Sequence, residues 1–232
     1  MLKGVIFDMD GVVVDSHPVH IKAWKRVLDT AGVVVMDQEL DVVREGKTKE
    51  EILRHFMGCI SADDIRVYGE EKDRIYREEA TQLKAVKGVK RLLNQLRQAG
   101  IATAIASSGS AWRVHDTLEV LGLKHYFRVV VSGTEFAAGK SDSTIFLKTA
   151  QRMQVECEGV LVFEDSVAGA RSAVSLGMKC LGIGDTIRAG SLIAVGAERV
   201  LPNFVAISLS ELQRLFTDAC AINAAVVSSV FR

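Results

Sequence analysis

The stretch that decides the fold is KGVIFDMDG, at residues 3–11. Its apolar centre stops abruptly at two carboxylates, Asp8 and Asp10, which are followed by Gly11. A short apolar run that ends in acidic residues and glycine is typical of a buried strand followed by a turn. We therefore predict a strand over Lys3–Asp8 with polar side chains at its carboxyl end.

Similar short runs recur along the chain and alternate with amphipathic segments. This alternation predicts βαβ units, and so an α/β fold with a mainly parallel sheet covered by helices on both faces. The further strands are expected at Ile101–Ala106, Arg128–Val131, Val160–Glu164 and Lys179–Ile183. The intervening helices are expected at Val86–Ala99, Ala111–Leu121, Ser143–Met153 and Val167–Leu176.

One long segment breaks the alternation, because residues 16–84 show helical patterning and no clear strand. We predict that residues 16–84 form a small α-helical cap domain inserted into a catalytic core made of residues 1–15 and 85–232. The tail Thr217–Arg232 is compatible with either a docked helix or a disordered end. The cap helices are expected at His17–Ala31, Gln38–Glu45, Lys49–Met57 and Ala62–Glu79.

The composition limits the classes of partner. The chain has 29 basic and 29 acidic side chains, so no global positive field favours nucleic acid or an anionic membrane. No apolar stretch is long enough to span a bilayer, and no secretory signal is evident at the N-terminus. The scattered cysteines form no C-x-x-C pair, which favours reduced, mostly buried thiols in a cytoplasmic protein over a zinc site or a disulfide framework. The sequence does not indicate an oligomeric state.

Polar clusters follow four of the predicted strands. Because the carboxyl ends of parallel strands meet at one edge of a sheet, these clusters should form a single site. Each cluster alone has an ordinary structural explanation, such as a turn or a helix start. Their joint occurrence is what indicates chemistry. The clusters are Asp8-Met9-Asp10, Ser107-Ser108-Gly109, Gly139-Lys140-Ser141 and Glu164-Asp165-Ser166.

These residue types suit the transfer of a phosphoryl group with Mg²⁺. A carboxylate that attacks a phosphate must overcome charge repulsion, which Mg²⁺ held by oxygen ligands reduces. Asp8 is the expected nucleophile, and Asp10 is the expected acid–base. The metal should be held by Asp8, Asp165 and the Asp10 carbonyl, with Glu164 supporting. Lys140, Ser107 and Ser108 should bind the oxygens of the transferring group.

The quoted residues resemble the haloacid dehalogenase superfamily of phosphotransferases. Phe7-Asp8-Met9-Asp10-Gly11-Val12 is similar to the first motif of that family, and Ser107, Lys140 and Glu164-Asp165 fall where its other three motifs lie. The resemblance extends from Lys3 to about Phe216. It implies a Rossmann-like core with an aspartate nucleophile and a helical cap. Family members that cleave carbon–halogen bonds lack the second aspartate, so Asp10 favours phosphoryl transfer.

Within the superfamily, the cap resembles that of β-phosphoglucomutase and related sugar-phosphate phosphatases. Lys47, Thr48 and Lys49 lie where that group has a specificity loop, and His20 and Lys72 match further cap residues. We therefore expect these five residues to contact a small phosphorylated metabolite. His20 is equally compatible with simple packing near the hinge.

Three departures from the mutase pattern weaken the site for a second phosphate. The prolines that usually follow the motif-three lysine are missing, and Ser141-Asp142-Ser143 stands in their place. Ser110 and Ala111 stand where the mutase has a Lys-Asn pair, and Lys49 stands where it has an arginine. A lysine cannot reproduce the bidentate grip of an arginine on phosphate. We therefore favour a phosphatase, with a phosphomutase as the alternative.

Two other classes of phosphate-handling protein share some of these residue types. A P-loop NTPase ending at Gly139-Lys140-Ser141 would need glycine at position 134, where the chain has Thr134. A phosphoaspartate receiver domain, the non-enzymatic alternative, would carry its aspartate on a middle strand and have no helical insertion. Both readings fit the sequence less well than a phosphatase.

Overall fold

The apolar run near the N-terminus forms strand β1 (Gly4–Phe7), in the middle of a sheet. This is seen in a computed structural model, which describes residues 1–45, 47–135 and 143–217. Within these ranges, six strands pair in the order β5-β4-β1-β6-β7-β8, and every pair is parallel. The predicted α/β fold with a parallel sheet is therefore confirmed. The other strands are β4 (Ala102–Ser107), β5 (Val129–Ser132), β6 (Val160–Glu164), β7 (Lys179–Ile183) and β8 (Arg199–Leu201).

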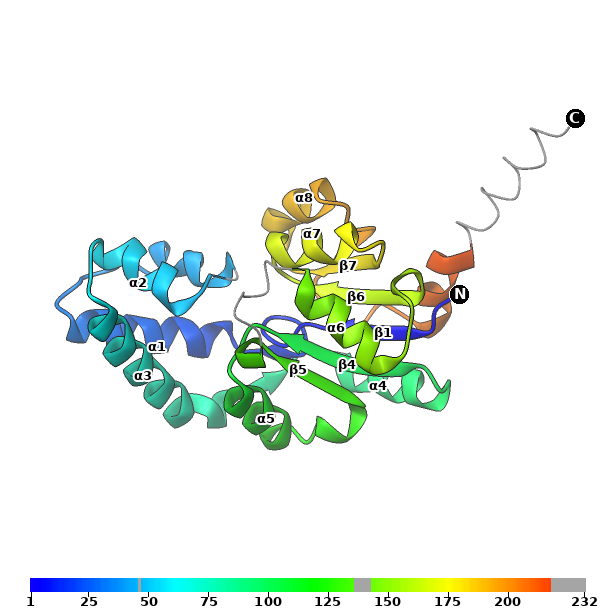
Figure 1. Ribbon diagram of the computed structural model, residues 1–232, viewed down its shortest axis with the longest axis horizontal. Helices are drawn as coiled ribbons and strands as arrows, with labels where there is room; N and C mark the ends of the chain where they lie inside the picture. The colour runs from blue at the N-terminus through cyan, green and yellow to red at the C-terminus, as the bar shows by residue number, and fades with distance from the viewer. Residues whose placement is uncertain (46, 136–142, 218–232) are drawn as a thin grey trace, which may run out of the picture.

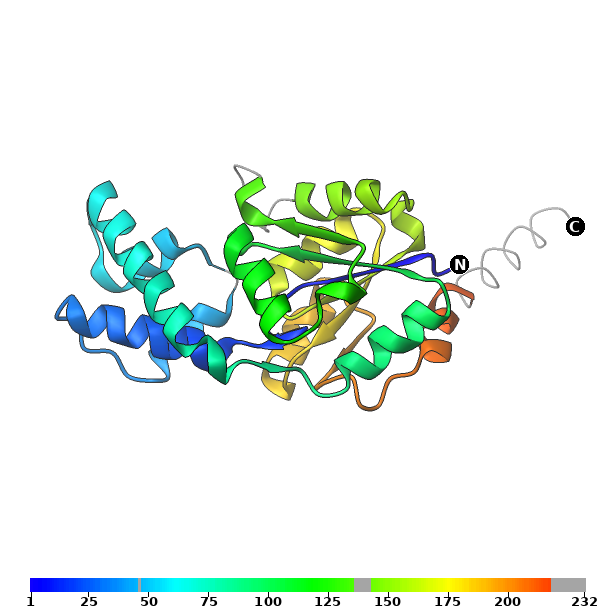
Figure 2. The ribbon, with the colours of Figure 1, turned by 90° about the horizontal axis from the view of Figure 1, so that it is seen from below.

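Helices cover both faces of the sheet, as Figure 2 shows from below. Alternate residues of β1 point to opposite faces, since Val5 and Phe7 belong to one buried cluster and Ile6 to another. The cluster with Phe7 packs against α4 and α5, and the cluster with Ile6 packs against α6 and α7. These helices are α4 (Val89–Gln98), α5 (Ala111–Val120), α6 (Thr144–Met153) and α7 (Val167–Ser175), followed by α8 (Thr186–Ala194).

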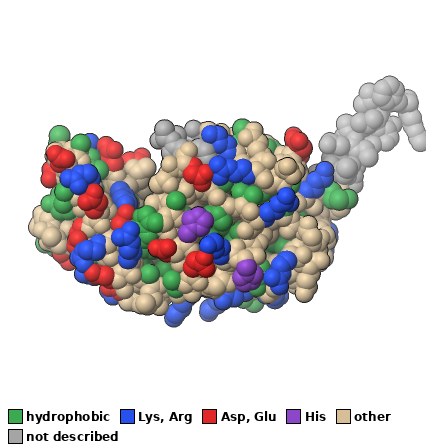
Figure 3. Space-filling model, turned by 60° about the horizontal axis from the view of Figure 1, so that its bottom comes forward, with side chains coloured by type: hydrophobic (Ala, Val, Ile, Leu, Met, Phe, Trp, Pro, Cys, Tyr) green, Lys and Arg blue, Asp and Glu red, His purple; other side chains and the backbone are tan. Residues whose placement is uncertain are grey.

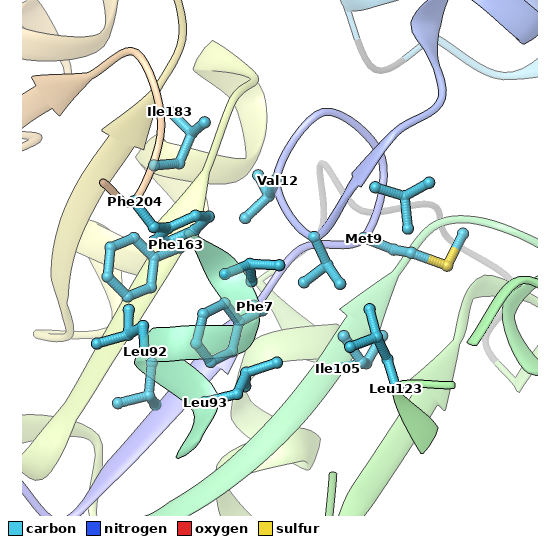
Figure 4. Close-up of a cluster of buried hydrophobic side chains, with 14 of the residues drawn as sticks. Phe7, Met9, Val12, Leu92, Leu93, Ile105, Leu123, Phe163, Ile183 and Phe204 are labelled. Carbon is cyan, nitrogen blue, oxygen red and sulfur yellow. The ribbon is translucent and has the colours of Figure 1, made fainter. Parts of the chain in front are cut away.

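Aromatic rings fill the core behind the first motif (Figure 4). The ring centroids of Phe7 and Phe163 lie 5.1 Å apart, and those of Phe163 and Phe204 lie 5.0 Å apart. All three side chains are fully buried. The burial of each of these aromatic side chains stabilises the fold by about 1.5–3 kcal/mol. This packing fixes the positions of Phe7 on β1 and Phe163 on β6, which directly precede Asp8 and Glu164.

The helices of residues 17–79 lie to one side of the sheet and contain their own apolar cluster (Figure 1). Trp24, Leu53 and Ile75 are among the buried members of this cluster. On the face drawn in Figure 3, acidic and basic side chains are interspersed over these helices. A separate cluster of this kind is compatible with the proposed cap at residues 16–84. The elements are α1 (His17–Thr30), the 3-10 segment η1 (Glu39–Glu45), α2 (Lys49–Met57) and α3 (Ala62–Glu79).

Three details differ from the prediction. The segment expected to lack strands ends in β3 (Lys84–Ala85), which pairs antiparallel with β2 (Val14–Asp15). Two-residue strands leave no periodic signal, so the pattern could not reveal them. The segment expected to be a helix up to Glu45 is 3-10 rather than α. Strand β8 and helix α8 were also not predicted.

The remaining expectations have mixed outcomes. Residues 209–217 are helical and place Leu212 and Phe216 in the core, whereas the rest of the tail lies outside the described residues. In the part of the chain that is described, no helix has both the length and the apolar character needed to cross a membrane. Cys59, Cys157 and Cys180 are free thiols, but only Cys180 is buried, so the expectation that the thiols are mostly buried is wrong for the cysteines that are described.

Candidate active site

The carboxylates predicted to share a site do meet at one edge of the sheet. Phe7 pairs in register with Phe163, so Asp8 and Glu164 emerge side by side at the ends of β1 and β6. One oxygen from each of Asp8, Glu164 and Asp165 lies within 4.8 Å of the others, and all three residues are buried. Glu164 is fixed further because its Oε2 accepts a hydrogen bond of 2.6 Å from the Ser166 backbone N–H. This cluster has the oxygen-only donor set that suits a divalent cation such as Mg²⁺.

A tight turn carries Asp10 into the same space. The N–H of Gly11 donates to the Val14 carbonyl at 2.8 Å, and Gly11 has φ +74°. A β-carbon at this position would lie 2.3 Å from Asp165 Oδ2 and 2.4 Å from His17 Nε2. Glycine is therefore required both by the backbone conformation and by the closeness of the Asp165 carboxylate.

Asp10 has several side-chain partners in the cleft. Nη1 of Arg113 donates to both of its oxygens at 2.8 Å, and the hydroxyl of Ser16 donates to Oδ1 at 2.6 Å. Burial alone would raise the pKa of Asp10, but the charge of Arg113 and a hydrogen bond from His20 outweigh it. The net effect holds the pKa well below its usual range, so the carboxylate is ionised in this arrangement.

The loop after β4 places the two predicted serines differently. Ser107 is fully buried, and its Oγ accepts a hydrogen bond of 3.1 Å from the Gly109 N–H. This leaves the hydroxyl hydrogen of Ser107 able to donate to another acceptor. Ser108 is exposed and lines the cleft. Both serines therefore stand close to the carboxylate cluster, at the end of the strand beside β1.

A cleft of about 390 Å³ connects this edge of the sheet to the helices of residues 17–79. Asp8 and Asp165 lie on its sheet side, whereas Lys47, Lys49 and Lys72 lie on its helical side. A cleft of this size suits a small molecule rather than a macromolecule. The arrangement brings together all of the predicted cap residues that are described, which also include His20 and Thr48.

Lys49 and Thr48 have partners within the helical segment. Lys49 Nζ lies 2.5 Å from Asp73 Oδ2 and 3.3 Å from the Gly69 carbonyl. Thr48 caps α2, because its hydroxyl accepts from the Glu51 N–H while the Glu51 carboxylate accepts from the Thr48 N–H. The Thr48 side chain therefore holds the start of the helix as well as lining the cleft.

His20 links the helices to the catalytic turn. Lys72 Nζ lies 2.9 Å from His20 Nδ1, and His20 Nε2 lies 3.2 Å from Asp10 Oδ1. When the Lys72 amine is protonated it can only donate, so Nδ1 then accepts and the proton on Nε2 faces Asp10, with Arg113 Nη1 3.3 Å from the same nitrogen. Burial and the charge of Lys72 lower the pKa of His20 to about 3, so the ring is neutral at pH 7. Burial and the charge of Arg113 lower the pKa of Lys72 to about 7.

Comparisons with known proteins agree with this geometry. The family model described as haloacid dehalogenase-like hydrolase matches residues 5–183. The chain belongs to this family. It is 34% identical over 186 residues to the phosphorylated carbohydrates phosphatase of Thermotoga maritima, a match that covers 77% of this chain and 83% of the relative.

Further relatives place the chain in the β-phosphoglucomutase-like group of the haloacid dehalogenase-like hydrolases. It is 29% identical over 192 residues to β-phosphoglucomutase of Bacillus subtilis, covering 79% of this chain and 84% of the relative. The fold is similar to the crystal structure of β-phosphoglucomutase from Clostridium difficile, with a TM-score of 0.83 and 20% identity, covering 95% of this chain and all of that one. The predicted enzyme class, a phosphoric monoester hydrolase, is confirmed at this level.

One expected family residue cannot be located, and two unexpected residues lie in the site. Lys140, predicted to neutralise the transferring group, lies outside the described residues. Arg113 was not predicted, although it lies only a few residues after Ser107 in the first turn of α5. His17 was also missed, and its Nε2 lies 2.8 Å from Asp165 Oδ2. The sequence places both residues at helix starts beside motif loops, which was the available signal.

Proposed function

We propose that the chain is a Mg²⁺-dependent phosphatase of small phosphorylated carbohydrates, with Asp8 as the nucleophile. The observation that carries the proposal is the buried triad of Asp8, Glu164 and Asp165, which opens into a cleft lined with lysines on the opposite side. The name of the Thermotoga maritima relative supports the substrate class. The proposed phosphoryl transfer is based on the residues of this site and on the family to which the chain belongs.

The triad fits a magnesium ion. Its donors are carboxylate oxygens from a buried cluster, and Mg²⁺ is a hard cation that prefers such ligands. Asp8 and Asp165 would hold it, with the Asp10 carbonyl as a further ligand and Glu164 in support. When bound, the cation supplies positive charge that offsets the repulsion between a carboxylate and a phosphate.

The residues of the chain divide the reaction into two displacements. An Asp8 oxygen forms a bond to phosphorus while the bond from phosphorus to the sugar oxygen breaks, and a protonated Asp10 gives its proton to the departing alkoxide. Water then attacks the aspartyl phosphate, Asp10 takes a proton from that water, and Asp8 is released with inorganic phosphate. Ser107 and Lys140 are the proposed donors to the phosphoryl oxygens.

The ionised Asp10 described above cannot act as an acid. It must gain a proton and leave at least some of its contacts with Arg113 before it can protonate the leaving group. Its position, two residues after Asp8 on a turn rather than on the strand, is suited to such a movement. We assign to this turn the exchange of Asp10 between a resting arrangement and a reacting one.

Hydrolysis is favoured over mutase chemistry by the donors near the helical end of the cleft. A mutase must hold a bisphosphate and exclude water while it turns over. The Lys49 amine is occupied by Asp73, and Ser110 and Ala111 offer no cation at the two positions where the mutase has a Lys-Asn pair. The mutase stays the alternative because His20 and Lys72 are both present in the cleft.

The nucleophile is tested by Asp8→Asn, with Asp116→Asn as the matched control because Asp116 is exposed on α5. Asp8→Asn should reduce kcat for phosphate release to below a tenth, a barrier increase above about 1.4 kcal/mol. Asp116→Asn should retain full activity. EDTA should abolish activity in the unchanged protein, and added Mg²⁺ should restore it. An Asp8→Asn protein that keeps more than a tenth of kcat would rule out the nucleophile.

The choice between phosphatase and mutase is tested with β-glucose 1-phosphate and catalytic β-glucose 1,6-bisphosphate. Phosphate release and formation of glucose 6-phosphate are measured in the same reaction. We expect phosphate release to be faster, because Lys49, which is paired with Asp73, does not help to keep a bisphosphate in the cleft while it turns over. Isomerisation that outruns phosphate release by tenfold would reverse the assignment.

A further inference from the structure

Arg113 places a guanidinium group in the middle of the cleft, between the catalytic turn and the helices. Only 8% of its side chain is exposed, and its Nη1 contacts both oxygens of Asp10. Its Cζ lies 5.5 Å from the centroid of the Tyr76 ring. These contacts hold the group at one position against the ring, rather than leaving it as a mobile surface cation.

Gly109 makes the room for this guanidinium. A β-carbon at Gly109 would lie 2.1 Å from Arg113 Nη2 and 2.7 Å from its Cζ. The φ of Gly109 does not lie in the left-handed region, so the backbone at this position is one that alanine can adopt. Glycine is therefore needed at position 109 because Arg113 packs so closely against it, and not because of the backbone conformation of the loop.

The charges around Arg113 are not balanced. Lys72 Nζ lies 4.9 Å from the centroid of the same Tyr76 ring. Arg113 and Lys72 also contact the two nitrogens of the His20 ring, Arg113 at Nε2 and Lys72 at Nδ1. Among the described residues, no carboxylate lies within 4.0 Å of Lys72 Nζ, whereas Lys47 and Lys49 each have an acidic partner. Arg113 is paired with Asp10, whereas Lys72 contacts the neutral His20 ring. Buried cations in excess of carboxylates favour the binding of an anion.

We propose that Arg113 binds a second anionic group, a carboxylate or a phosphate, at the end of the substrate that does not react. This inference rests on the proposed phosphatase function and specifies its substrate class. A guanidinium group offers several N–H donors in one plane, which suits either anion. The anion takes donors of Arg113 that Asp10 holds in the structure described, so binding of a matching substrate frees Asp10 for its role at the leaving group.

The test compares three open-chain substrates that share a reacting phosphate and differ only at the other end. Sorbitol 6-phosphate carries a hydroxyl there, 6-phosphogluconate a carboxylate, and sorbitol 1,6-bisphosphate a second phosphate. We expect kcat/KM for at least one doubly anionic substrate to exceed that for sorbitol 6-phosphate by tenfold or more. The substrate that gains identifies the anion as carboxylate or phosphate.

Two variants assign this preference to Arg113. Arg113→Gln should lower the ratio of kcat/KM between the doubly and singly anionic substrates at least tenfold. Gly109→Ala should lower it in the same direction, because the new methyl group displaces the guanidinium without removing it. The proposal would be overturned if both variants lowered kcat/KM equally for all three substrates. It would also be overturned if kcat/KM of the unchanged protein for the doubly anionic substrates were less than about twice that for sorbitol 6-phosphate.

A binding measurement separates this proposal from the phosphatase assignment. In the Asp8→Asn protein, titration calorimetry should show tighter binding of the doubly anionic ligand, and Arg113→Gln added to this background should abolish the difference. If no substrate releases phosphate from the unchanged protein but binding still discriminates, the phosphatase assignment fails and the anion site stands. If binding does not discriminate, the anion site fails.

Discussion

The pair formed by Asp10 and Arg113 gives a quantitative prediction for stability. The exposed fractions of the two side chains are 19% and 8%, so removing either partner leaves a mostly buried charge unpaired. Breaking a fully buried pair costs about 3–5 kcal/mol. Because Asp10 is partly exposed and asparagine still accepts the Ser16 hydrogen bond, we expect Asp10→Asn to lower the free energy of unfolding by about 2–3 kcal/mol.

The double variant should be more stable than the sum of the single losses implies. Arg113→Met alone should cost about 1–2 kcal/mol, since Asp10 keeps Ser16 and His20 as partners. Adding Arg113→Met to Asp10→Asn removes the unpaired cation, so the coupling free energy should be about 1.5–2 kcal/mol. For a chain of this length, each 1 kcal/mol corresponds to about 2–4 °C in Tm.

The assay is urea unfolding followed by far-ultraviolet circular dichroism and by the fluorescence of Trp24 and Trp112. Trp24 belongs to the helical cluster and Trp112 lies beside Arg113, so agreement between the probes shows whether one transition is measured. A matched control is the exposed pair Arg66 and Glu70 on α3, for which the coupling should stay below about 0.5 kcal/mol. A coupling below about 0.5 kcal/mol for Asp10 and Arg113 as well would refute the reasoning.

Two other predictions concern Lys72 and Gly11. Because burial lowers the pKa of Lys72 to about 7, its amine is charged below that pH and neutral above it, so KM for an anionic substrate should rise as pH increases through 7. His20, Arg113, Asp10, Asp73 and Lys49 are the titratable groups around it, and Lys72→Arg, which stays charged, should flatten the KM profile. Gly11→Ala should weaken Mg²⁺ binding, measured by calorimetry, at least tenfold through its clash with Asp165. Gly32→Ala is its control, with a similar φ of +76° and no atom within 4 Å of the added carbon, so equal losses of Mg²⁺ affinity in both variants would contradict the clash.

The main strands could be predicted because each is a buried run bounded by polar residues. Val160–Glu164 and Lys179–Ile183 were predicted with the bounds that the structure has. Strand β8 was missed because only Leu201 of its three residues is buried, which leaves no run to recognise. Edge strands of this length depend on their neighbour for their conformation, and the sequence does not encode that neighbour locally.

The meeting of the three buried carboxylates could be predicted for a topological reason, whereas the position of Arg113 could not. Asp8 lies at the carboxyl end of β1, and Glu164 and Asp165 lie at the carboxyl end of β6. Because β1 and β6 are parallel neighbours, the three side chains must lie close together. Arg113 reaches Asp10 only because α5 begins where it does and because Gly109 has no side chain. The contact depends on where α5 begins and how it is oriented, and on the room that Gly109 leaves for the guanidinium. A pattern of residue types reveals neither.

The short ribbon of β2 and β3 has an evolutionary consequence. Val14 pairs with Ala85 and Asp15 pairs with Lys84, so the long helical segment leaves the sheet domain and returns to it at the same point. A segment whose two ends are adjacent can lengthen, shorten or be exchanged without altering the register of the strands that carry the carboxylates. Descendants of one ancestral hydrolase could therefore acquire new substrates by varying this peripheral segment while inheriting the reaction unchanged.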